Sequence, residues 1–107
     1  MTVIRINAIE VPDGLGAELE ARFARRAAAV DDAPGFLGFE LLRPTGDAER
    51  RYFVVTRWES EAAFLDWTRS EAFQRGHAES REQPLGTHST VLEFESVVSS
   101  TPERAAV

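Results

Sequence analysis

The residues best suited to chemistry are a tryptophan and a histidine in SEAAFLDWTRSEAFQRGHAES (60–80). Trp67 and His77 are separated by nine residues, and the whole chain has only two residues of each type. An imidazole binds a metal or a haem iron through one ring nitrogen, and an indole offers a large rigid surface to a flat ligand. Asn7 lies in the middle of a Val- and Ile-rich segment, where asparagine is uncommon. We therefore predict that Asn7 is the polar third member of the same site.

A histidine on a helix is more often a surface or hydrogen-bonded residue than a ligand. Two features favour a ligand here. Phe73 precedes His77 by four residues, which places both on one apolar helix face, and the following loop (81–87) carries Pro and Gly and could close over a cleft. A single histidine suits haem, whose iron needs one protein bond, better than zinc, which needs three or four. We expect His77 to be the axial ligand of a haem iron and Phe73 to contact the haem.

Other patterns favour ordinary structure. Gly14-Leu15-Gly16 follows a strand, but the third glycine of a dinucleotide fingerprint is replaced by Leu19, so no nicotinamide or flavin is expected. His88 has no partner at a suggestive spacing and is predicted on the surface. The acids Glu93 and Glu95 could form an acid–base pair or simply occupy solvated strand positions. The chain has no cysteine, which excludes disulfides and thiolate chemistry.

Strand alternation and helical periodicity predict the order βαββααβ within one domain. Ser60 and Ser70 are predicted N-caps of the second and third helices, and Trp58 is predicted in the core. This order predicts an α+β, ferredoxin-like fold with an antiparallel sheet and helices on one face. The expected strands are 2–11, 36–43, 51–58 and 88–98, the expected helices begin at 16, 60 and 70, and the first helix is expected to end at 31; residues 1–98 form the domain and 99–107 a flexible tail.

The strands 36–43 and 51–58 carry large apolar residues on both faces. Helices on one side would leave the other side apolar and uncovered, and such a patch is too large for a stable monomer. A second copy packed sheet to sheet is the simplest cover, so we predict a homodimer with a two-fold axis, a dimeric α+β barrel.

Composition excludes several partners. The 107 residues carry a formal net charge of −6, with 18 acids and 12 arginines and no lysine. This balance argues against nucleic acid, which requires clustered positive charge. No signal peptide and no apolar run of membrane-spanning length is visible, so we expect a cytoplasmic protein.

The chain resembles the haem-degrading monooxygenases of the IsdG and MhuD type, within the antibiotic biosynthesis monooxygenase superfamily. The resemblance covers about residues 3–97 and is closest to the mycobacterial branch. The segment between Trp67 and His77 is similar to the staphylococcal branch and is one residue longer than in the mycobacterial one. The stretches that carry the resemblance are INAIEVP (6–12), PGFLGFELLRP (34–44), RYFVVTRWES (51–60) and LEFE (92–95).

The resemblance implies catalytic roles for Asn7, Trp67 and His77, and places Phe23 and Arg26 beside the haem. Haem would be both cofactor and substrate, held by His77, with Trp67 bending the porphyrin and Asn7 donating a hydrogen bond on the oxygen side. The ring would be cleaved with O₂ and electrons from an external donor, releasing iron. Two alternatives stay open: a cofactor-free monooxygenase of a polyphenolic or quinone-like substrate, and a non-catalytic barrel that binds haem or another hydrophobic ligand. The cleavage position, product, electron donor and number of haems per subunit also stay open.

Overall fold

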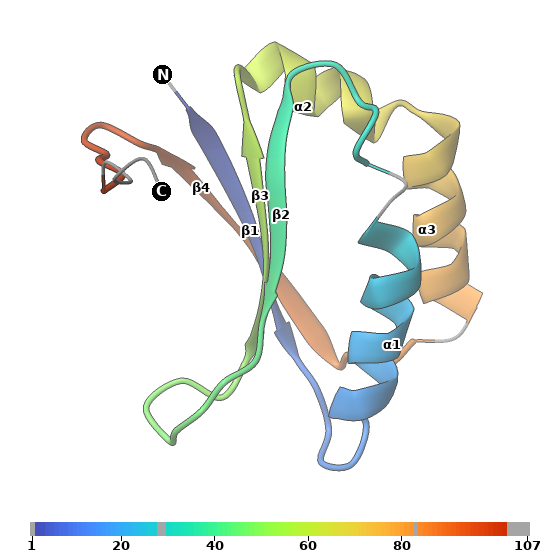
Figure 1. The fold of residues 1–107 in the computed structure, drawn as a ribbon. Helices are drawn as coiled ribbons and strands as arrows, with labels where there is room; N and C mark the ends of the chain where they lie inside the picture. Colours follow the sequence, from blue (N-terminus) through green and yellow to red (C-terminus); the bar gives the residue numbers. More distant parts are fainter. Residues whose placement is uncertain (1, 28–29, 83, 103–107) are drawn as a thin grey trace, which may run out of the picture.

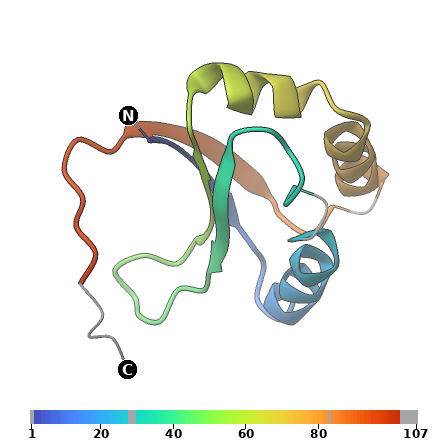
Figure 2. The same ribbon diagram turned by 45° about the horizontal axis from the view of Figure 1, so that its top comes forward.

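The computed structural model describes residues 2–27, 30–82 and 84–102 of the chain. The predicted order βαββααβ is confirmed. Four strands form one sheet, and the helices all lie on the same side of it (Figures 1 and 2). The strands are β1 (Val3–Glu10), β2 (Phe36–Leu42), β3 (Tyr52–Trp58) and β4 (His88–Glu95), and the helices are α1 (Gly16–Arg26), α2 (Glu61–Thr68) and α3 (Glu71–Glu82).

The sheet is antiparallel, with strand order β2-β3-β1-β4. β1 is therefore a central strand, and Asn7 lies between Val54 of β3 and Val91 of β4. Because side chains alternate along a strand, Arg5 and Asn7 point to the same face. This central position explains how a polar side chain near the N-terminus reaches the middle of the molecule.

The fully buried Trp58 at the end of β3 is the centre of the core, as the sequence predicted. Its ring meets Phe36 of β2 edge-on at 5.4 Å between centroids and Phe64 of α2 at 5.9 Å. Val3 and Val30 complete the buried cluster. The core thus joins the sheet to α2 at one end of the molecule.

Two predicted boundaries are wrong. The first helix was expected to reach residue 31 but α1 ends at Arg26, and Val30 is buried from a turn instead. Acidic residues at 31–32 oppose the negative end of a helix, and Pro34 disfavours helix at the residue before it. The last strand was expected to reach 98 but β4 ends at Glu95, after which Val97 and Val98 are exposed.

The predicted tail (99–107) is described only in part. Residues 96–102 form no helix or strand, and residues 103–107 lie outside the described residues. The domain boundary at 98 and the tail therefore stay predictions. In the described part of the chain, no helix is both long and apolar enough to cross a bilayer.

The sheet face opposite the helices carries the large apolar residues that the sequence predicted, together with the ion pair between Arg57 and Glu40. The register places Leu42, Val55, Ile6 and Leu92 on this face, with Phe94 further along β4. Phe94 and Leu42 are among the exposed large hydrophobic residues. The β2–β3 loop and the segment after β4 both extend on this side (Figures 1 and 2).

Candidate active site

A cleft of about 810 Å³ opens between the helix-facing side of the sheet and the helices α1 and α3. Its volume falls within the range of roughly 300–1,000 Å³ that is typical of small-molecule sites. All six residues that the sequence pointed to lie on its wall. They are Asn7 of β1, Phe23 and Arg26 of α1, Trp67 of α2, and Phe73 and His77 of α3.

Asn7 brings an unpaired polar atom into this cleft. Its Oδ1 is buried and has no hydrogen-bond partner among the described residues. A buried polar group without a partner costs about 1–3 kcal/mol, and the strand neighbours Val54 and Val91 offer none. An amide held in this way is suited to a hydrogen bond with a ligand rather than with the protein.

The helices that carry Trp67 and His77 begin where the sequence predicts. The Ser60 hydroxyl accepts a hydrogen bond from the backbone N–H of Ala63 at 3.1 Å, and the Ser70 hydroxyl accepts one from Phe73 at 3.1 Å. Each cap satisfies one of the free N–H groups of a first helical turn. The two caps therefore fix the residues at which α2 and α3 start. The starting residue in turn determines which side chains of each helix face the cleft.

Phe73 connects the two candidate residues. Its ring meets Trp67 edge-on at 6.0 Å with an interplanar angle of 83°, and lies 4.1 Å from the His77 ring at 36°. Trp67 in turn rests against the buried Trp58 at 6.4 Å. The imidazole is exposed on the cleft side of α3, so it can reach a ligand while the phenyl ring fixes its orientation.

The charge on the cleft wall is opposite to that of the chain. Five of the twelve arginines and no aspartate or glutamate lie among the described residues that line it. Arg26 bridges α1 and α3, because a Cβ on Gly76 would lie 3.8 Å from its guanidinium, and it also sits over the Phe23 ring at 5.9 Å. Apolar walls with such a cationic lining suit a flat hydrophobic ligand that carries carboxylates.

Two cleft residues were missed by the sequence prediction. Arg22 is buried in α1 and lines the cleft one turn before Arg26, a four-residue spacing that could have been used. Arg5 lines it from β1, two residues before Asn7. A lone arginine in a strand gives no such signal, because its burial depends on distant residues.

The remaining motifs have ordinary roles. His88 is exposed at the start of β4, opposite Glu10, where it borders the cleft without a ring contact to the other described lining residues. Gly14 has a φ of 89° and serves a strand-to-helix turn. Glu93 and Glu95 are both exposed, and Glu93 lies 4.0 Å from Arg5 as an ion pair. The described residues contain no group of three or more His, Cys, Asp or Glu side chains that could hold a metal ion.

Residues 2–79 match the family model of the antibiotic biosynthesis monooxygenases. The chain belongs to this family. It is 56% identical over 98 residues to a haem oxygenase of Mycobacterium tuberculosis described as mycobilin-producing, covering 92% of this chain and 91% of that protein. The family resemblance found in the sequence is therefore confirmed.

Solved structures agree with this family assignment. The M. tuberculosis haem degrader MhuD, with two haems bound in its active site, superposes with a TM-score of 0.81 at 55% identity, over 92% of this chain and 99% of that one. SnoaB of Streptomyces nogalater, a cofactor-independent oxygenase, superposes with a TM-score of 0.74 at 28% identity, over 95% and 98%. The family fold thus carries both types of oxygenase, and the residues of the cleft must decide between them.

Proposed function

We propose that this protein is a haem-degrading monooxygenase, which binds haem in the cleft and opens the porphyrin ring with O₂ and external electrons, releasing iron. The observation that carries the proposal is the convergence of His77, Trp67 and the unpaired Asn7 amide on one cleft with a cationic lining. The chain is also highly similar to a haem oxygenase over nearly its whole length. Haem is both cofactor and substrate, and no flavin or nicotinamide is needed.

The residues present fit a haem. A ring nitrogen of His77 would bind the haem iron, and the imidazole contacts Phe73. The aromatic and aliphatic walls exclude water from a porphyrin face, and Arg26 can pair with a propionate. When bound, haem supplies the iron that binds and activates O₂.

The protein side chains then direct the reaction. Asn7 faces the cleft with its amide, and its Nδ2–H group would donate a hydrogen bond to a ligand on the side of the haem where O₂ would react. Trp67, which is held by ring contacts with Trp58 and Phe73, would contact the porphyrin of a haem bound in the cleft. We assign His77 to iron binding and Asn7 and Trp67 to the oxidation step, with Phe23, Arg26 and Phe73 as further haem contacts.

Electrons must come from outside the chain, so a reductase or a small reductant is the proposed donor. The reducing poise of the cytoplasm suits such a reaction, and we propose that compartment. The apolar outer face of the sheet supports a homodimer packed sheet to sheet.

Haem titration of His77→Ala tests the proposal. The wild-type protein should shift the Soret band on binding haemin, and ascorbate should then bleach the band and give an oxygenated product in the mass spectrum. His77→Ala should lose the shift, because it removes the cleft imidazole that contacts Phe73 in α3. His88→Ala is the matched control, since it removes the other histidine of the chain and should keep the wild-type spectrum.

Two results would contradict the proposal. A His77→Ala protein with the wild-type haem spectrum would reject the ligand assignment. A wild-type protein that binds no haem but oxidises a polyphenol would favour the cofactor-free alternative, which the similarity to SnoaB supports. Haem binding without loss of the Soret band in ascorbate would instead indicate a binding protein.

A further inference from the structure

We propose that Arg5 is a positioning residue that holds the start of α2 on the sheet and thereby sets the place of Trp67 in the cleft. The first part of this proposal concerns the protein without ligand. Its consequence for turnover rests on the proposed haem-degrading function.

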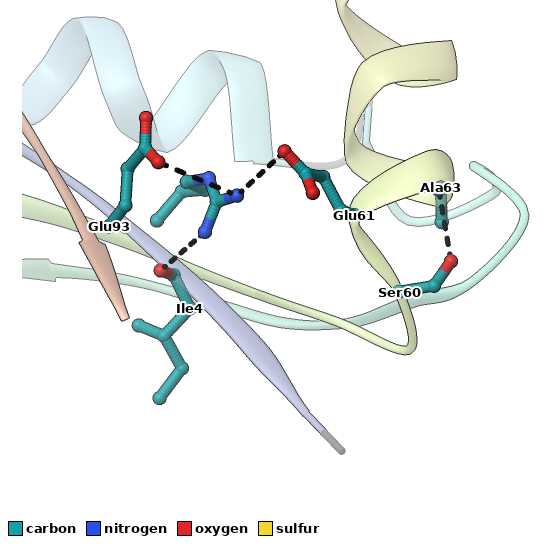
Figure 3. A network of polar contacts seen from close by, with 6 residues as sticks. Ile4, Ser60, Glu61, Ala63 and Glu93 are labelled. Carbon is teal, nitrogen blue, oxygen red and sulfur yellow. Dashed lines mark hydrogen bonds and ion pairs between the residues drawn. The ribbon is translucent and has the colours of Figure 1, made fainter. Parts of the chain in front are cut away.

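Arg5 is an unusually buried charge, with only 11% of its side chain exposed. Its Nη2 lies 3.6 Å from Glu61 of α2 and 4.0 Å from Glu93 of β4, and its Nη1 donates a hydrogen bond to the Ile4 carbonyl at 3.3 Å. Figure 3 shows Glu61 and Glu93 approaching from opposite sides. One guanidinium therefore connects the central strand to an edge strand and to a helix.

The same guanidinium also contacts the aromatic face of α2. It lies 5.3 Å from the centre of the Phe64 ring, a cation–π distance. Phe64 and Trp67 are three residues apart and share one face of the helix. Arg5 thus contacts the first turn at Glu61 and the side chain that directly precedes Trp67 on the cleft-facing side.

α2 depends on such contacts because it is short. It has eight residues, none of them fully buried, and a helix of two turns is not stable alone. Ser60 caps its start (Figure 3), and Phe64 and Trp67 pack on Trp58. The cap fixes the residue at which α2 begins, but it does not fix the rotation of the helix about its own axis. Arg5 contacts the side of the helix at Phe64 and can fix this rotation.

The carboxylates also explain why Arg5 is not assigned to the ligand. Glu61 and Glu93 lie on both sides of its charge. A ligand carboxylate at Arg5 would have to displace them. Arginine suits this role better than lysine, because its planar fork can face two carboxylates and an aromatic ring together.

Fluorine NMR of ligand-free protein labelled with fluorotryptophan tests the positioning role. The two tryptophans give two resonances, which Trp67→Phe assigns. Arg5→Met should shift or broaden the Trp67 resonance and leave that of the buried Trp58 close to wild type, and Arg5→Lys should restore it in part. Arg51→Met is the matched control, because Arg51 also pairs with a carboxylate, Glu49, and sits over a ring, Phe53, but does not contact α2.

Turnover provides the second measurement. Arg5→Met should bind haem with an affinity within about twofold of wild type but degrade it at least about threefold more slowly, since misplacing a reacting group by 1 Å can cost up to 10²-fold. Arg51→Met should keep both values. Haem affinity that falls with a normal Trp67 resonance would overturn the proposal and make Arg5 a ligand contact.

The positioning role of Arg5 and the proposed haem-degrading function can be rejected independently of each other. An unchanged Trp67 resonance in Arg5→Met, with the fold intact by circular dichroism, overturns the positioning role whether or not the protein degrades haem. A shifted resonance supports positioning even in a protein that shows no haem turnover, which would reject the proposed function alone.

Discussion

The buried amide of Asn7 lowers the stability of the fold but is suited to binding a ligand. Its Oδ1 is buried without a hydrogen-bond partner in the described part of the chain, and it faces the cleft from the central strand. An apolar residue of similar size would fold at least as well at this position. We infer that the polar residue is kept for what it does to a ligand, as residues that break a local rule often are.

Asn7→Leu should therefore separate stability from activity. We expect an unchanged or raised midpoint of thermal unfolding, because the buried unpaired amide is removed, together with a Soret band close to wild type. Ascorbate-driven haem degradation should fall by about 10²-fold, the usual effect of losing one fixed donor. Val54→Ala, which changes a neighbouring wall residue without a polar group, is the control and should lower stability more than the rate. A stable Asn7→Leu protein with full turnover would remove Asn7 from the mechanism.

A polar cluster away from the cleft connects the helix α1 to the sheet. The Glu20 carboxylate accepts hydrogen bonds from the Arg43 guanidinium, with Nε at 2.8 Å, and from the Tyr52 hydroxyl at 2.6 Å. Gly16 leaves room for that hydroxyl, since a Cβ there would collide with it. The cluster ties α1, and with it the cleft residues of its far end, to β2 and β3.

This cluster predicts a pH dependence of stability. The hydrogen bonds from Arg43 and Tyr52 lower the pKa of Glu20 from 4.5 to about 2. A lowered pKa adds stability that is complete above pH 4.5 and is lost as the pH falls toward 2. Glu20→Gln should therefore reduce stability at pH 7 and flatten its decline between pH 5 and pH 2, as measured by urea unfolding.

Glu49→Gln is the control for this prediction. Hydrogen bonds from Arg51 also lower the pKa of Glu49 to about 2, but Arg51 is only two residues away. The same pair can form in the unfolded chain, so it should contribute little to the difference between the two states. Equal acid sensitivity of the two variants would show that the Glu20 cluster does not hold α1.

The sheet face opposite the helices leaves large apolar side chains exposed to solvent. Phe94 and Leu42 are exposed on it, and the β2–β3 loop and the segment after β4 flank it on the same side (Figures 1 and 2). The helices cannot reach this face. A second copy would bury the apolar area that Leu42 and Phe94 leave exposed.

Phe94→Asp should convert the proposed homodimer into monomers. A charge within the proposed sheet-to-sheet contact would be buried without a partner, which costs several kcal/mol. Sedimentation velocity at micromolar concentration should show the lower mass. Leu65→Asp, which changes a comparably exposed leucine on α2, should leave the dimer intact. A wild-type protein that sediments as a monomer would contradict the prediction directly.

Local patterns in the sequence were sufficient for much of this structure. Alternation and helical spacing predicted every element, the caps Ser60 and Ser70, and the buried Trp58, because these features depend on neighbours along the chain. The same patterns predicted too long a first helix, because the apolar spacing of α1 continues to Val30. Val30 is buried, but it lies in a turn and not in the helix. Pro34 indicates that the helix ends before residue 33, but the apolar spacing up to Val30 favours a longer helix.

Local patterns along the chain were enough to identify the side chains that could do chemistry and the elements that carry them. That Asn7, Trp67 and His77 face one cleft follows from the fold, because their meeting depends on β1 being central in the sheet. The fold also places Arg5 between Glu61 and Glu93, although its pattern in the sequence is that of a surface charge. The burial and pairing of a single charge in a strand are set by residues distant in the chain, about which local periodicity carries no information.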